Sequence, residues 1–155
     1  MIAVGSIAPD FALPNQHRET VTLASFRDRF HVVVAFHPLA FTPVCSVQMQ
    51  TYERERPRLD ALDTHVLALS LDANPSKKAW AESLGGISYD LLSDVQPHGR
   101  VAAAYGVMRD DGLAERAVFV VDKAGVIRWA KVYDMDQQPD VNELLAALSS
   151  LTSTD

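Results

Sequence analysis

Cys45 is the only cysteine of the 155-residue chain, and its neighbours give it the setting of a nucleophile. Thr42 carries a hydroxyl suited to a helix N-cap, and Pro43 suits the first helical position, so a helix is expected to begin at Pro43 and to place Cys45 third. The free N–H groups and the positive dipole end of a helix start favour a thiolate over a thiol. Since the thiolate is the nucleophilic form of cysteine, this pattern predicts a reactive sulfur.

A structural role is the alternative for Cys45, because a lone cysteine often serves as a small buried hydrophobe. Its position favours chemistry. Residues 31–36 are rich in β-branched side chains without polar alternation, which is typical of a strand covered on both faces, and Pro38 ends that run. Open α/β sheets place their sites at the carboxyl ends of such strands. Pro38 lacks an N–H and has a fixed φ, so it either holds the loop over the sulfur or simply terminates the strand.

The composition excludes several classes of function. With 14 basic and 20 acidic side chains the formal net charge is −6, which argues against a nucleic-acid binder or a polybasic membrane anchor. A single cysteine excludes an intrachain disulfide, a C-x-x-C pair and therefore a disulfide oxidoreductase. The five histidines show neither H-x-x-x-H nor H-E-x-x-H spacing, so the sequence predicts no metal site and no cofactor.

The start and length of the chain set expectations about location and domains. Residues 1–6 lack the positive segment and the cleavage site of a secretory signal, and the longest apolar stretch is far shorter than the ~20 residues of a membrane helix. We therefore expect a cytoplasmic protein. The length fits one domain, residues 1–155, with a single core.

The elements that must position Cys45 follow from periodicity and turn residues, and their order predicts an α/β fold with a central mixed β-sheet flanked by helices. The expected elements are a short hairpin over 10–13 and 21–23, strands 31–36, 64–71 and 89–92, helices 43–56, 75–84 and 99–105, an antiparallel hairpin of 116–121 with 126–131, and an amphipathic helix over 139–151.

Residues 36–45, Phe-His-Pro-Leu-Ala-Phe-Thr-Pro-Val-Cys, resemble the P-x-x-x-T-x-x-C signature of peroxiredoxins. The resemblance extends over about residues 5–150 and implies a thioredoxin-like fold with an N-terminal β-hairpin. It also implies a thiol-dependent peroxidase, an oxidoreductase that reduces hydrogen peroxide and organic hydroperoxides. The other similar segments are residues 8–11, 69–72, 91–94, 105–107 and 116–122.

The resemblance implies roles for four residues. Cys45 becomes the peroxidatic cysteine, whose thiolate attacks one peroxide oxygen and forms a sulfenic acid. Attack pushes negative charge onto the other oxygen, and Thr42 and Arg116 become the donors that stabilise it. Pro38 becomes the residue that keeps water from the sulfur. The structural alternatives are a plain helix cap for Thr42 and a surface arginine at a strand edge for Arg116.

The missing second cysteine makes the chain most similar to one-cysteine peroxiredoxins of the alkyl hydroperoxide reductase E type. The sulfenic acid must then be reduced by an external thiol, which is a low-molecular-weight thiol, a glutaredoxin-like or mycoredoxin-like protein, or thioredoxin. Many relatives carry Glu three residues after the cysteine. This chain has Gln48 there, which keeps hydrogen bonding but loses the charge.

Three questions stay open in the sequence. Similar peroxiredoxins are commonly homodimers, and Phe41, Trp80 and Tyr105 either contribute to such a surface or pack in the core. His37 either titrates beside the site or is a neutral histidine packed under the loop. The alternative function is a redox-sensing or interaction module of the same fold, whose cysteine oxidises slowly and whose output is a partner contact.

Overall fold

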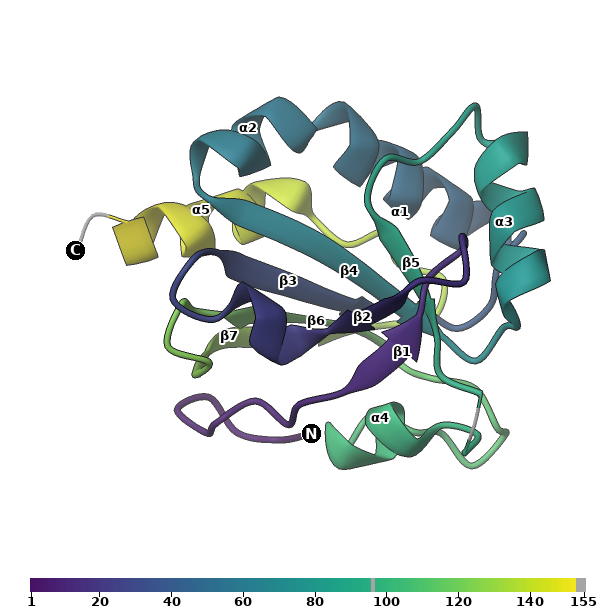
Figure 1. Ribbon diagram of the computed structural model, residues 1–155, viewed down its shortest axis with the longest axis horizontal. Helices are drawn as coiled ribbons and strands as arrows, with labels where there is room; N and C mark the ends of the chain where they lie inside the picture. Colours follow the sequence, from purple (N-terminus) through teal and green to yellow (C-terminus); the bar gives the residue numbers. More distant parts are fainter. Residues whose placement is uncertain (96, 153–155) are drawn as a thin grey trace.

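The computed structural model describes residues 1–95 and 97–152, and its centre is a five-stranded mixed sheet with strand order β5-β4-β3-β6-β7 (Figure 1). Strands β3, β4 and β5 run parallel, whereas β6 is antiparallel to β3 and β7 is antiparallel to β6. The predicted α/β fold is therefore confirmed. The strands are β3 (His31–Phe36), β4 (Thr64–Ser70), β5 (Asp90–Ser93), β6 (Arg116–Val121) and β7 (Ile127–Tyr133).

The predicted N-terminal hairpin is present as a separate antiparallel sheet of β1 (Ala12–Pro14) and β2 (Thr20–Thr22). A 3-10 helix that the sequence did not predict, η1 (Leu23–Phe26), follows it. The α-helices are α1 (Pro43–Arg54), α2 (Arg56–Ala61), α3 (Asn74–Ser83), α4 (Arg100–Ala104) and α5 (Val141–Thr152). Across residues 1–95 and 97–152, no helix is long and apolar enough to cross a membrane.

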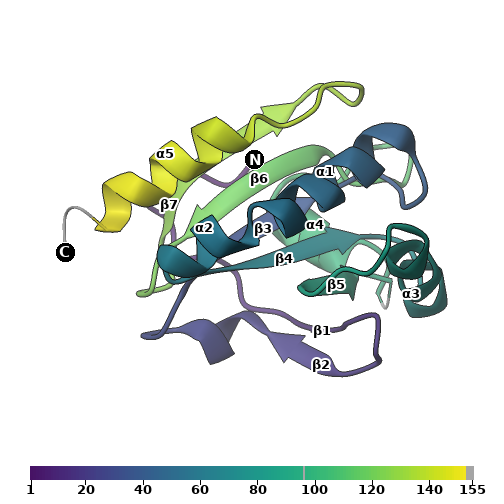
Figure 2. The same ribbon diagram turned by 90° about the horizontal axis from the view of Figure 1, so that it is seen from above.

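Both faces of the sheet are covered, which explains why β3 lacks polar alternation (Figure 2). Val33 packs in one buried cluster with side chains of α1, α2 and α5, whereas Val32 packs in a second cluster with the N-terminal hairpin and α4. Both valines are at most 1% exposed. The central strand is thus fixed from two sides, and the loop that leaves its carboxyl end starts from a rigid base.

The helix expected over residues 43–56 is present as α1 but ends two residues earlier, and the sequence did not predict the helix that follows it, α2. Helix α1 ends at Arg54, and α2 begins at Arg56 after Glu55, whose backbone has φ −88° and ψ 2°. Pro57 lies in the first turn of α2. Proline has no N–H for a bond to the preceding turn and its ring clashes there, so it suits a helix start and breaks a helix interior.

Of the three aromatic residues considered for a dimer surface, two are core residues. Trp80 and Tyr105 are fully buried, so a surface role for them is wrong. The Tyr105 ring packs with Phe36 and Phe119, and its hydroxyl donates to the Pro9 carbonyl at 2.8 Å. Phe41, in contrast, is 56% exposed.

Candidate active site

Cys45 occupies the third position of α1, as the sequence predicts, because the helix begins at Pro43 after an extended Thr42. The sulfur lies just beyond the carboxyl end of β3, at the end of the loop formed by residues 37–42. Cys45 is fully buried and belongs to the cluster packed under α1. Burial alone would also suit a structural cysteine, so the polar contacts of the sulfur decide the interpretation.

Arg116 contacts the sulfur directly. Its Nη1 donates to Cys45 Sγ at 3.3 Å, and the residue is 2% exposed, so the interpretation as a surface arginine is wrong. Sheet register explains the contact. Phe36 at the end of β3 pairs with Ala117 of β6, so Arg116 lies opposite the point where the active-site loop begins. Residues 71 positions apart in the sequence therefore meet at one buried site.

Gln48 accepts a second hydrogen bond from Arg116. Nη1 donates to Gln48 Oε1 at 2.9 Å, and Gln48 Nε2 donates to the Tyr52 hydroxyl at 3.1 Å. Burial raises the pKa of Tyr52 to about 12, so the phenol stays protonated at physiological pH. Because Gln48 is uncharged, it orients the guanidinium without neutralising it. The positive charge of Arg116 thus remains available to a thiolate at Cys45.

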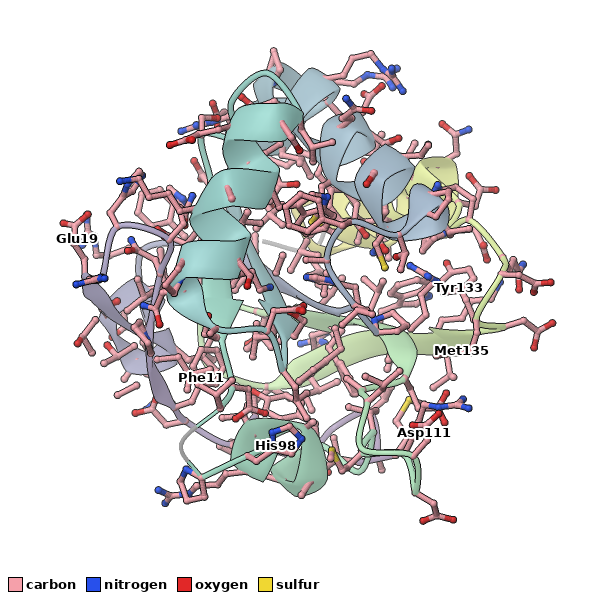
Figure 3. The ribbon with its side chains drawn as sticks, turned by 90° about the vertical axis from the view of Figure 1, so that its right-hand side faces the viewer. Phe11, Glu19, His98, Asp111, Tyr133 and Met135 are labelled. Carbon is pink, nitrogen blue, oxygen red and sulfur yellow. The ribbon has the colours of Figure 1, made fainter. Side chains whose placement is uncertain are left out.

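Met135 completes the set of Arg116 partners through its backbone. Arg116 Nε and Nη2 donate to the Met135 carbonyl at 3.2 and 2.9 Å, and Figure 3 shows Met135 beyond the end of β7, near Tyr133. Sequence reasoning missed this contact, since any residue type supplies a carbonyl. The position of Gln48 near the sulfur, in contrast, could be predicted, because Gln48 lies three residues after Cys45 and residues three apart share a helix face.

The expectation that the Thr42 hydroxyl caps α1 is wrong. Thr42 stands at the N-cap position, but its side chain forms no cap hydrogen bond, and its Oγ1 donates to the Leu39 carbonyl at 2.8 Å. The hydroxyl proton is thus used within the loop. The carbonyl of Thr42 still accepts the first helical bond, from Ser46 N–H at 2.9 Å. Among the described residues, no hydrogen bond joins Thr42 Oγ1 to the sulfur of Cys45.

Pro38 is buried in a loop that is anchored on both sides. His37 N–H donates to the Leu69 carbonyl at 2.9 Å and thereby extends the pairing with β4. Asp72, just after β4, accepts the Ala40 N–H at 2.9 Å. Phe41 adopts a positive φ of 67°, an uncommon conformation for a residue with a side chain. These contacts fix the turn between β3 and α1, the turn that leads to Cys45.

His37 is the neutral histidine under the loop rather than a group that titrates near neutrality. It is fully buried, and its Nε2 lies 2.9 Å from Lys77 Nζ. Burial, followed by the positive charges of Lys77 and Arg116, lowers the pKa of His37 well below its ordinary value. The sequence did not single out Lys77, because nothing distinguishes it there from its neighbour Lys78 and because lysine is rarely buried.

The arrangement suits nucleophilic attack by sulfur. A guanidinium beside a buried cysteine stabilises a thiolate, and the same donors can stabilise charge that develops on a leaving oxygen. Within the part of the chain that the structure describes, no three or more His, Cys, Asp or Glu side chains gather as potential metal ligands.

Comparison with known sequences gives matches along the chain. The AhpC/TSA family model matches residues 4–130. Alkyl hydroperoxide reductase E of Mycobacterium tuberculosis is 38% identical over 154 residues, which cover 99% of this chain and 100% of that protein. The chloroplastic 2-cysteine peroxiredoxin of Chattonella marina var. antiqua is 33% identical, with 97% of this chain and 80% of that protein covered.

Solved structures agree with this result. The reduced 2-Cys peroxiredoxin of Plasmodium vivax superposes with a TM-score of 0.88 at 25% identity, covering 97% of this chain and 82% of that one. Mycobacterium tuberculosis AhpC, at 22% identity, shares the fold with a TM-score of 0.88 and coverage of 100% and 96%. The chain belongs to the AhpC/TSA family of peroxiredoxins and is a thiol-dependent peroxidase, an oxidoreductase.

Proposed function

We propose that the protein reduces hydrogen peroxide and organic hydroperoxides in a one-cysteine cycle, with Cys45 as the peroxidatic cysteine. The observation that carries this proposal is the 3.3 Å contact between Arg116 Nη1 and Cys45 Sγ in a buried site. A charged donor at this distance favours the thiolate and is preorganised for the charge that develops during attack.

The first step forms a bond between sulfur and oxygen and breaks the bond between the two peroxide oxygens. Sulfur is oxidised to the sulfenic acid, and the peroxide is reduced to an alcohol or water once the leaving oxygen takes a proton. Arg116 holds the thiolate and the leaving oxygen together. Thr42 donates to the peroxide after its hydroxyl rotates away from the Leu39 carbonyl, and Pro38 helps to exclude water.

The second step uses thiols from outside the chain, because Cys45 is the only cysteine. One thiol condenses with the sulfenic acid to give a mixed disulfide and water, and a second thiol releases reduced Cys45. The proposed reductants are a low-molecular-weight thiol, a glutaredoxin-like or mycoredoxin-like protein, or thioredoxin. In this proposal residues 1–155 act as one cytoplasmic domain.

A homodimer is the proposed assembly. Three apolar side chains are exposed on the active-site loop and on α1: Leu39 is 41%, Phe41 56% and Val47 49% exposed. Exposed apolar side chains that gather in one region are typical of protein–protein contacts. Phe41 also packs against Trp80, with ring centroids 6.4 Å apart, so this surface is continuous with the site.

Peroxide consumption by the purified protein tests the proposed cycle. With a small thiol present we expect many turnovers, and without it about one peroxide consumed per chain before further oxidation begins, since no second cysteine can regenerate the first. Cys45→Ser is the control and should consume none. If the parent protein turns over with none of the proposed thiol classes, the redox-sensing alternative replaces the peroxidase cycle.

A further inference from the structure

Lys77 of α3 is a buried cationic side chain that the proposed cycle does not use. It is fully buried, and its Nζ lies 2.9 Å from His37 Nε2. Lysine is almost never fully buried unless it is paired, and here the hydrogen-bond partner is a neutral imidazole rather than a carboxylate. Burying an ammonium here costs free energy, so whether Lys77 stays protonated depends on a negative charge nearby.

The charged groups around Lys77 come from several elements. Asp72 follows β4, Cys45 belongs to α1, and Arg116 of β6 acts on His37. The pKa of Lys77 is lowered to about 7, because burial lowers it by more than the negative charges of Asp72 and Cys45 raise it. The Asp72 carboxylate is already bonded, since its Oδ2 accepts the Ala40 N–H at 2.9 Å and the Ser70 hydroxyl at 2.6 Å.

The contacts of His37 link Lys77 to the reactive end of α1. The imidazole packs against Trp80 with ring centroids 5.2 Å apart, and Trp80 Nε1 donates to the hydroxyl of Ser46, directly after Cys45, at 3.0 Å. When Lys77 donates to Nε2, the ring proton lies on Nδ1, which has no hydrogen-bond partner among the described residues. His37 thus serves Lys77 as an acceptor and holds the ammonium at the start of the loop.

We propose that Lys77 is a positioning residue whose ammonium, held by His37, stabilises the Cys45 thiolate and loses its proton when Cys45 becomes an uncharged sulfenic acid. This inference rests on the peroxidatic role proposed for Cys45. The reaction balances: thiolate, ammonium and hydroperoxide give sulfenic acid, neutral amine and alcohol or water. By linkage, if the ammonium favours the thiolate, the thiolate favours the ammonium to the same extent.

The expected pH dependence follows from the sign of the shift. Lys77 is charged below a pH of about 7, so its support for the thiolate is present on the acid side and is lost as the pH rises. Lys77→Met should therefore lower the rate constant with peroxide roughly tenfold on the acid side, the effect of about one pKa unit, and match the parent at alkaline pH.

Stopped-flow measurement of the peroxide reaction across pH tests this expectation. Lys78→Met is the matched control, because Lys78 is an exposed lysine on the same helix, and it should follow the parent profile. Lys77→Arg, which keeps the charge, should retain more of the acid-side rate than Lys77→Met. A Lys77→Met profile that is unchanged, or that is lowered equally at every pH, would overturn the role of the charge.

Proton uptake by the parent protein gives a test that needs no variant. One equivalent of hydrogen peroxide is added just below a pH of about 7 in weak buffer containing an indicator. If Lys77 supplies the proton, uptake from solution stays well below one proton per chain that starts as a thiolate, as counted by thiolate absorbance before the addition, whereas uptake of one full proton per such chain contradicts the proposal. A parent protein that does not react with peroxide at all would instead refute the peroxidatic role of Cys45.

Discussion

Arg116→Ala is expected to lower the second-order rate constant with hydrogen peroxide by at least ~10²-fold, the loss typical of removing one preorganised donor. The substitution removes the 3.3 Å contact to Cys45 Sγ and also leaves Gln48 Oε1 and the Met135 carbonyl without their donor. Both the thiolate and the leaving oxygen therefore lose support. The measurement is the rate of peroxide-dependent oxidation of the reduced protein.

The matched control is Arg128→Ala. Arg128 lies on the neighbouring strand β7, is about half exposed, and pairs with Asp122 at 3.2 Å, away from the sulfur. Exposed ion pairs contribute little to stability, so this variant should fold and react like the parent. If Arg116→Ala oxidises as fast as the parent and Arg128→Ala, the proposed role of Arg116 is wrong.

Excess peroxide without reductant is expected to inactivate the protein completely. Once Cys45 is a sulfenic acid, nothing else in the chain can trap it as a disulfide, so a second and third oxygen are added and activity is not recovered by later thiol. A small thiol present before oxidation should instead give a mixed disulfide at Cys45 and preserve activity. Residual activity and intact mass, followed together, measure both outcomes.

Recovery of full activity by thiol after prolonged exposure to excess peroxide would contradict this expectation. So would a rate of inactivation that does not change when the thiol is added first. Cys45→Ser provides the mass control, because it should gain no oxygen at this position and thereby separates oxidation of Cys45 from oxidation of the methionines.

The parts of the fold that were predictable are those specified by short segments. The β-branched run over residues 31–36 predicts a strand covered on both faces, and β3 has those bounds. Pro43 predicts the start of α1 and the third position of Cys45. Pro57 also carried information: it follows the helix expected over 43–56 and lies in the first turn of α2, a second helix that the sequence did not predict.

The contacts of the site were harder to predict from the sequence, because they depend on strand register and on backbone groups. The motif resemblance indicated Arg116, but only the pairing of Phe36 with Ala117 places it opposite the active-site loop. The Met135 carbonyl has no signature in side-chain types. For Thr42 the residue type was misleading. Threonine is suited to capping a helix, but the Thr42 hydroxyl donates instead to the Leu39 carbonyl, three residues earlier in the loop.

The burial of Lys77 is another feature that the sequence does not predict. In the sequence, Lys77 and Lys78 are adjacent and chemically identical, and the usual expectation for both is exposure. Helix α3 turns one toward the buried His37 and the other toward solvent. Which lysine is buried depends on how α3 packs on the loop after β3, and the local sequence does not predict that packing.

A one-cysteine cycle through Cys45 can be tested by adding one equivalent of hydrogen peroxide to the reduced protein and measuring intact mass and migration on a non-reducing gel. In this cycle each chain should gain one oxygen, react with a nucleophile that traps sulfenic acids, and migrate as a single chain. Dominant formation of a dimer linked by a disulfide between two Cys45 residues would contradict it and would show that the subunits resolve one another.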